Sequence, residues 1–141
     1  MKRFILAFIA AFIFIVFWGW FYNGTMLREV FAQAAQIHGL FRPREETVSL
    51  FHWIIIGQAG LAIAFVGIYA SGFAGRGIVG GILLGVLLEI LAIGARCMIY
   101  ATQPFPARLL ALITFGGFIE MIGTGILVGA IYKSGATTAK S

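Results

Sequence analysis

Residues 77–101 read GIVGGILLGVLLEILAIGARCMIYA, an apolar run whose only charged members are Glu89 and Arg96. A helix needs about 20 mostly apolar residues to cross the hydrocarbon core of a bilayer. This run is long enough, so it predicts a transmembrane helix. It also predicts that two ionisable side chains lie within or near an apolar medium.

Three further stretches, at about 4–22, 49–71 and 108–132, have the same character. Polar or helix-breaking residues separate them, and two of the three connections are short. The sequence therefore predicts an all-α protein of one membrane domain, residues 1–141, built as an antiparallel four-helix bundle. The residues at 134–141 are small and polar, and we expect them to form a mobile tail.

The composition supports a membrane protein. Hydrophobic residues make up 61% of the chain, charged residues 11%, and the mean hydropathy is +1.01. A soluble domain is about half apolar and about a quarter charged. The high apolar content excludes a disordered chain and a nucleic-acid binder. A disulfide scaffold is excluded because Cys97 has no second cysteine to pair with. The net charge of +5 suits contact with lipid headgroups.

The first span follows Lys2 and Arg3 and resembles a signal peptide, but a bulky aromatic cluster stands where a cleavage site would be. We interpret it as an uncleaved anchor. In the following segment, 23–47, apolar residues recur at spacings of three and four. This pattern predicts an amphipathic segment on the membrane surface or an extension of the first span bent at Gly24. Pro43, with Glu45 and Glu46 behind it, is typical of a helix start.

The distribution of basic residues favours cytoplasmic N- and C-termini in a bacterial inner membrane. The cytoplasmic side would carry Lys2, Arg3, Arg76, Lys133 and Lys140, against Arg28, Arg42, Arg44 and Arg108 on the other side. Five against four is a small positive-inside bias. A dual topology stays open on these counts.

Within the spans, the burial of four polar residues in an apolar medium needs an explanation: Glu89, Arg96, Glu120 and Gln58. A charged group at mid-bilayer costs about 2.5–3.5 kcal/mol. Glu89 and Glu120 stand at the midpoints of their spans, and Gln58 stands close to the midpoint of its own. If the helices are neighbours, we expect these three side chains to share one layer.

Small residues accompany the two carboxylates at helical spacing, which favours close helix contacts around them. The pattern has a functional and a structural interpretation. Two carboxylates at one depth would share a proton and could carry protons or a cation. Alternatively, Glu89, Glu120, Gln58 and Arg96 form a buried polar cluster that fixes helix register and oligomeric state. Arg96 lies roughly 10 Å along the helix from Glu89 and could pair with a carboxylate of an adjoining helix.

The remaining residues give little support for a catalytic, metal or cofactor site. His52 stands near a span end, where a lone histidine is more often an interfacial residue than a ligand, although a single-histidine cofactor stays open. Cys97 is best interpreted as a small filler. The sequence contains no catalytic, phosphate-binding or metal-binding motif, so no cofactor, metal site or catalytic residue is predicted.

Several passages resemble a group of small bacterial membrane proteins with four predicted spans. They are Phe41-Arg42-Pro43-Arg44-Glu45-Glu46, the run from Gly77 to Gly85, Pro104-Phe105-Pro106, Ile119-Glu120-Met121-Ile122 and Ile131-Tyr132-Lys133. The resemblance implies a four-helix inner-membrane protein with an acidic residue at Glu120 in the last span. It implies no activity.

These observations predict a non-enzymatic membrane protein that acts by assembly, either as a homo-oligomer or as an accessory subunit of a membrane complex. Its partners would be the lipid bilayer and other membrane helices. The alternative is a small proton- or cation-coupled transporter or channel that uses Glu89 and Glu120. An intramembrane enzyme or a single-histidine cofactor protein comes third.

Overall fold

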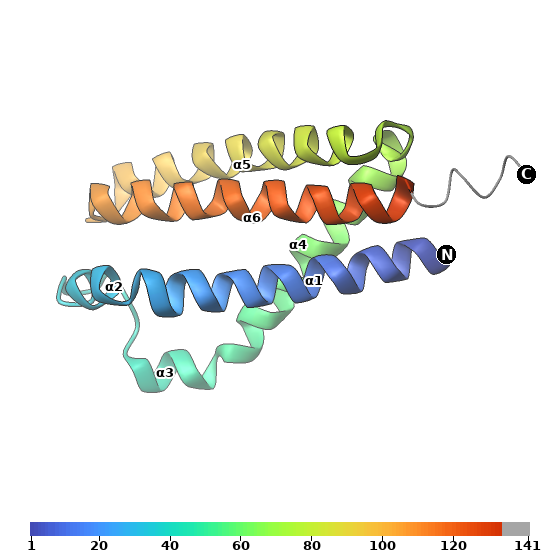
Figure 1. Cartoon of the computed structure of the whole chain (residues 1–141). Coiled ribbons are helices and arrows are strands. Elements are labelled where there is room, and N and C mark those ends of the chain that lie inside the picture. Colours follow the sequence, from blue (N-terminus) through green and yellow to red (C-terminus); the bar gives the residue numbers. More distant parts are fainter. Residues whose placement is uncertain (134–141) are drawn as a thin grey trace, which may run out of the picture.

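The computed structural model describes residues 1–133 and is all-helical over that range (Figure 1). The expected tail at 134–141 lies outside the described residues. The elements are α1 (Lys2–Phe21), a π-helical turn (Tyr22–Met26), α2 (Arg28–Ala34), α3 (Arg44–Ser49), α4 (Phe51–Gly72), a 3-10 turn (Ala74–Arg76), α5 (Gly77–Thr102) and α6 (Ala107–Lys133). Four of these helices, α1 with its π-helical turn and then α4, α5 and α6, are long and apolar enough to cross a membrane. The predicted all-α class and the four apolar helices are therefore confirmed.

Fewer residues of the segment between the first two long helices are helical than its periodicity predicts. The π-helical turn extends α1 to Met26, and α2 then ends at Ala34. Gly39 adopts a left-handed conformation with φ of 78°, which a continuous helix does not allow. The chain therefore turns back, and the ring of Phe41 packs on that of Phe31 with centroids 5.8 Å apart.

Helix α3 begins as its sequence indicates. Pro43 is its N-cap residue, and Glu45 and Glu46 occupy the first turn, where carboxylates interact favourably with the positive end of the helix dipole. Arg42 also forms an exposed ion pair with Glu46. This short helix leads directly into α4.

Helices α5 and α6 form the most intimate pair in the fold, joined by residues 103–106 and lying side by side (Figure 1). Their backbones touch where glycines face each other. A Cβ atom on Gly81 would collide with the backbone of Gly125, and one on Gly129 would lie 2.7 Å from the carbonyl oxygen of Gly77. The glycine repeats of the two spans are thus the contact surface that lets the helices approach closely.

Helix α1 packs against the other side of α6 through aromatic side chains. The Nε1 of Trp18 donates a hydrogen bond to the carbonyl oxygen of Gly116 (3.0 Å), and the Tyr22 hydroxyl donates to that of Leu112 (2.9 Å). The ring of Tyr22 occupies the space where a Cβ on Gly116 would be. Trp18 and Tyr22 therefore tie two helices together through specific donor groups.

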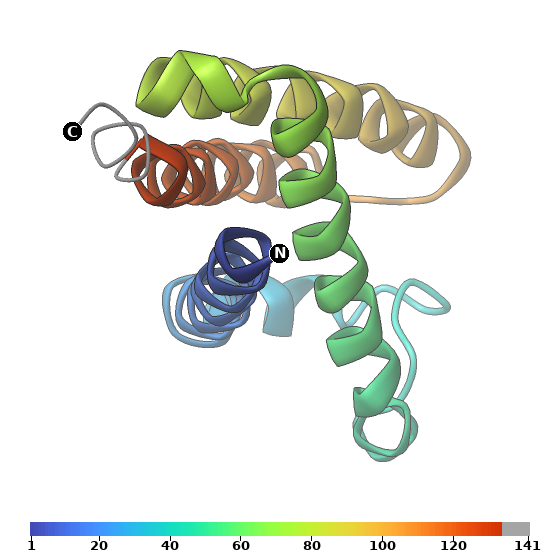
Figure 2. The ribbon, with the colours of Figure 1, turned by 90° about the vertical axis from the view of Figure 1, so that its right-hand side faces the viewer.

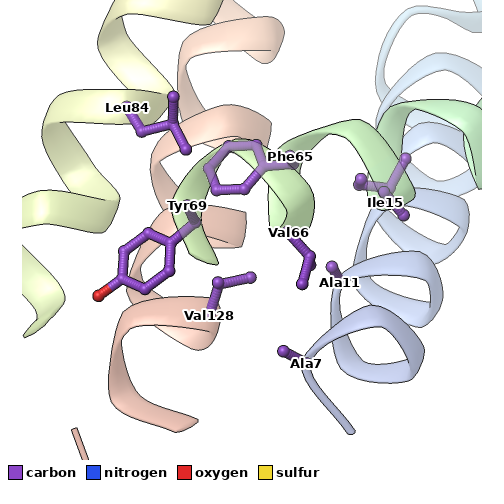
Figure 3. Close-up of a cluster of buried hydrophobic side chains, with 9 residues drawn as sticks. Ala7, Ala11, Ile15, Phe65, Val66, Tyr69, Leu84 and Val128 are labelled. Carbon is purple, nitrogen blue, oxygen red and sulfur yellow. The ribbon is translucent and has the colours of Figure 1, made fainter. Parts of the chain in front are cut away.

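Helix α4 crosses the other three long helices steeply instead of lying alongside them (Figure 2). Its C-terminal half carries most of its buried side chains, and these belong to a core cluster shared by all four long helices (Figure 3). That cluster comprises Ala7, Ala11, Ile15, Ala62, Phe65, Val66, Tyr69, Leu84 and Val128. The Tyr69 hydroxyl also donates to the carbonyl oxygen of Gly77 at the start of α5 (2.8 Å). The expected antiparallel bundle arrangement is not confirmed.

We predict that Gly81→Ala lowers the free energy of unfolding by about 1–3 kcal/mol, because the added methyl group meets the backbone of Gly125 and forces α5 and α6 apart. The matched control is Gly94→Ala in the same helix, where a Cβ would meet nothing within 4 Å. It should be neutral or raise the free energy of unfolding by up to about 1 kcal/mol. Unfolding in mixed detergent micelles, followed by circular dichroism, measures both. Equal effects would contradict the observed contact.

Candidate functional site

A partly open cavity of about 700 Å³ lies between α4, α5 and α6. Most of its wall is apolar, and the polar contribution comes from three charged residues. The lining residues are Leu61, Ala64 and Phe65 of α4, Leu88, Glu89, Leu91, Ala92, Gly94, Ala95, Arg96 and Met98 of α5, and Gly117, Glu120 and Met121 of α6. Because it gathers three charged residues between three helices, we take it as the candidate site.

Glu89 is the most deeply buried charged residue among residues 1–132, with only 1% of its surface exposed. Arg96, seven residues along the same helix, donates a hydrogen bond to its carboxylate. The arginine thus pairs within α5 and not with an adjoining helix, because its long side chain reaches back over two turns of its own helix. The pairing offsets part of the cost of placing a carboxylate in an apolar interior.

Gly117 of α6 makes the room that this carboxylate needs. A Cβ atom at Gly117 would lie 2.7 Å from Oε2 of Glu89, so any larger residue would displace the acid. Sequence reasoning did not identify Gly117. The adjacent glycines Gly116 and Gly117 are its only signal, and they face different elements: Gly116 meets Tyr22 of the π-helical turn that follows α1, while Gly117 meets Glu89 of α5.

Glu120 lies on α6 in the wall of the same cavity and is half-buried. It is close enough to Glu89 and Arg96 to interact electrostatically with both. Its carbonyl oxygen accepts a hydrogen bond from the Thr124 hydroxyl (2.7 Å), but over residues 1–132 its carboxylate receives none. The cavity therefore contains two carboxylates and one guanidinium group, and the guanidinium is committed to Glu89.

Gln58 lies elsewhere. It packs against α1, where its Nε2 is 3.1 Å from the position that a Cβ on Gly19 would take. Its Oε1 is buried and has no hydrogen-bond partner within the described residues. The structure thus brings together Glu89, Arg96 and Glu120, and Gln58 is not among the residues that line their cavity.

The remaining candidates stand apart from this site. His52 is exposed, with its ring beside that of Trp53 (centroids 5.5 Å apart), and Cys97 is exposed as well. Within residues 1–133, no three His, Cys, Asp or Glu side chains are grouped so that they could hold a metal ion. Among the site residues predicted from the sequence, only Glu89, Arg96 and Glu120 line the cavity.

Comparison with known proteins found no matching family model, no matching curated protein and no matching solved structure.

We predict that Arg96→Met destabilises the fold by about 3–5 kcal/mol, because it leaves the buried Glu89 carboxylate without its counter-charge. Combining Arg96→Met with Glu89→Met removes both charges and should restore much of this loss. Unfolding free energies of the wild type, the two single variants and the double variant form the test. If the two single effects simply add in the double variant, the ion pair does not have this role.

Proposed function

We propose that this chain is an integral membrane protein that acts by assembly. In this proposal the four long apolar helices cross a bacterial inner membrane, with both termini on the cytoplasmic side. The partner is a second copy of the chain or, in the alternative form, a larger membrane complex in which this chain is an accessory subunit. The ion pair of Glu89 and Arg96 then has a structural role inside each copy.

A stripe of small residues on α4 carries the proposal. The positions follow one another at spacings of three and four, so they share one face of the helix: Gly57, Gly60, Ala64, Gly67 and Ser71. All are exposed except Gly67, which is half-buried. A Cβ atom on any of the three glycines would meet nothing within 4 Å. At about 100° per residue, the stripe lies on the opposite side of α4 from Ala62, Val66 and Tyr69, which pack into the core.

The α5–α6 contact supports the same interpretation. There, glycines four residues apart allow two backbones to touch, which is how helices associate when lipid removes the hydrophobic driving force. The stripe on α4 has the same residue types but no partner helix within the described residues. A second α4 can supply that partner about a two-fold axis, because each copy then presents the same stripe to the other.

We predict that Gly60→Leu raises the dissociation constant of the oligomer roughly tenfold or more, which corresponds to about 1.4 kcal/mol. The leucine side chain would hold the two α4 backbones apart. Ala101→Leu is the matched control, because it adds comparable bulk at an exposed position of α5 outside the stripe. The mass of the purified protein in mild detergent, including anything that co-purifies, measures assembly. A monomeric wild type without a co-purifying partner would refute the proposal.

A second candidate function is proton- or cation-coupled transport. The observation that favours it is the gathering of Glu89, Arg96 and Glu120 in one cavity, where ionisable groups in an apolar medium are often functional.

The two functions differ in the ion flux that they predict. If the protein acts by assembly, Glu89→Gln and Glu120→Gln leave proton and cation flux in reconstituted vesicles at the level of protein-free vesicles. Flux through the wild type that Glu120→Gln abolishes would favour transport instead. The fluorescence of a pH dye or a cation dye inside the vesicles measures it.

A further inference from the structure

The cavity between α4, α5 and α6 has the size and lining of a small-molecule site. Its volume of about 700 Å³ falls within the range of about 300–1,000 Å³ in which such sites usually lie. Its wall is mainly Leu, Ala, Met and Phe, with the polar groups confined to Glu89, Arg96 and Glu120. A ligand that fits this lining has a large apolar body and few polar atoms.

The charges decide which polar group the ligand carries. Arg96 already donates to the buried Glu89, so this pair is close to neutral as a unit. Glu120 is the additional acid, and within residues 1–132 its carboxylate accepts no hydrogen bond. An ionised Glu120 beside apolar walls attracts a cation strongly, since little water screens the interaction. An anion would meet two carboxylates and one guanidinium group that is already engaged.

We propose that this cavity binds a small amphiphilic cation, meaning an apolar molecule with one protonated amine, quaternary ammonium or quaternary phosphonium group that pairs with Glu120. A bare Ca²⁺ or Mg²⁺ ion does not fit, because these ions take six or more oxygen ligands and the cavity offers mainly carbon. An uncharged acyl chain would fill the volume but leave Glu120 without a partner. An amphiphilic cation fits the apolar wall of the cavity and also pairs with the carboxylate of Glu120.

This inference is independent of the proposed assembly. The residues that carry it are Glu120 and the cavity wall, whereas the assembly proposal rests on the stripe of small residues on α4, of which only Ala64 lines the cavity. Either proposal can fail without the other.

The test uses two probes of nearly the same shape and opposite charge, tetraphenylphosphonium and tetraphenylborate. Equilibrium dialysis of the purified full chain in mild non-ionic detergent measures saturable binding of each probe. We expect saturable binding of the phosphonium cation near one per chain. We expect no saturable binding of the borate anion, because Glu120 repels it and Arg96 is already paired with Glu89.

Two variants locate the binding site, and a third serves as control. Glu120→Gln keeps the shape but removes the charge, and it should weaken phosphonium binding at least about thirtyfold, as expected when one partner of a buried charge pair is removed. Ala92→Phe narrows the cavity without changing any charge, and it should abolish saturable binding of the phosphonium cation. Glu29→Gln removes an exposed carboxylate of α2 and should leave binding unchanged.

Circular dichroism and unfolding of each variant show whether it still folds. If Glu120→Gln is unfolded, Ala92→Phe supplies the test by itself. The proposal is overturned if folded Glu120→Gln or folded Ala92→Phe binds the phosphonium cation as the wild type does. It is also overturned if both probes bind equally well, or if the wild type binds neither saturably.

Discussion

The backbone contact between α5 and α6 is the constraint on which the rest of this structure depends. Where Gly81 faces Gly125 and Gly77 faces Gly129, no side chain can stand between the two helices. Bulky side chains are therefore displaced to the flanks of the pair, where α1 covers one side and α4 crosses. The carboxylate of Glu89 fits against α6 because Gly117 leaves space for it. The glycines of α5 and α6 thus allow both the close contact of the two helices and the burial of Glu89 against α6.

The steep crossing of α4 explains why a cavity exists beside that acid. Phe65, Val66 and Tyr69 anchor the C-terminal half of α4 in the core, and the Tyr69 hydroxyl holds it to the start of α5. From this anchor α4 runs away from the α5–α6 pair (Figure 2), so its contacts with α5 and α6 are few. A helix that lay along the pair would cover the wall that contains Glu89, Arg96 and Glu120. Because it crosses instead, these three residues line a partly open cavity.

The sequence predicts the four long helices well, because their length and hydropathy are local properties. It also predicts that Glu89, Arg96, Glu120 and Gln58 are the polar residues whose burial needs an explanation, since burying polar groups in an apolar medium is costly. Spacing along one helix could not show that Arg96 reaches back to Glu89, that Gly117 makes room on α6, or that Gln58 turns to Gly19. Those outcomes depend on the angles between helices, which hydropathy does not encode.

The two open sides of α4 differ in chemistry, and this difference separates the two proposals. The stripe of small residues has no charge and suits the close approach of another helix, whereas the cavity is lined by three charged residues. Ala64 belongs to both, because it is a member of the stripe and also lines the cavity. A partner helix on the stripe would therefore border the cavity mouth. If both proposals hold and ligand binding changes the affinity of assembly, assembly must change the affinity for the ligand by the same factor.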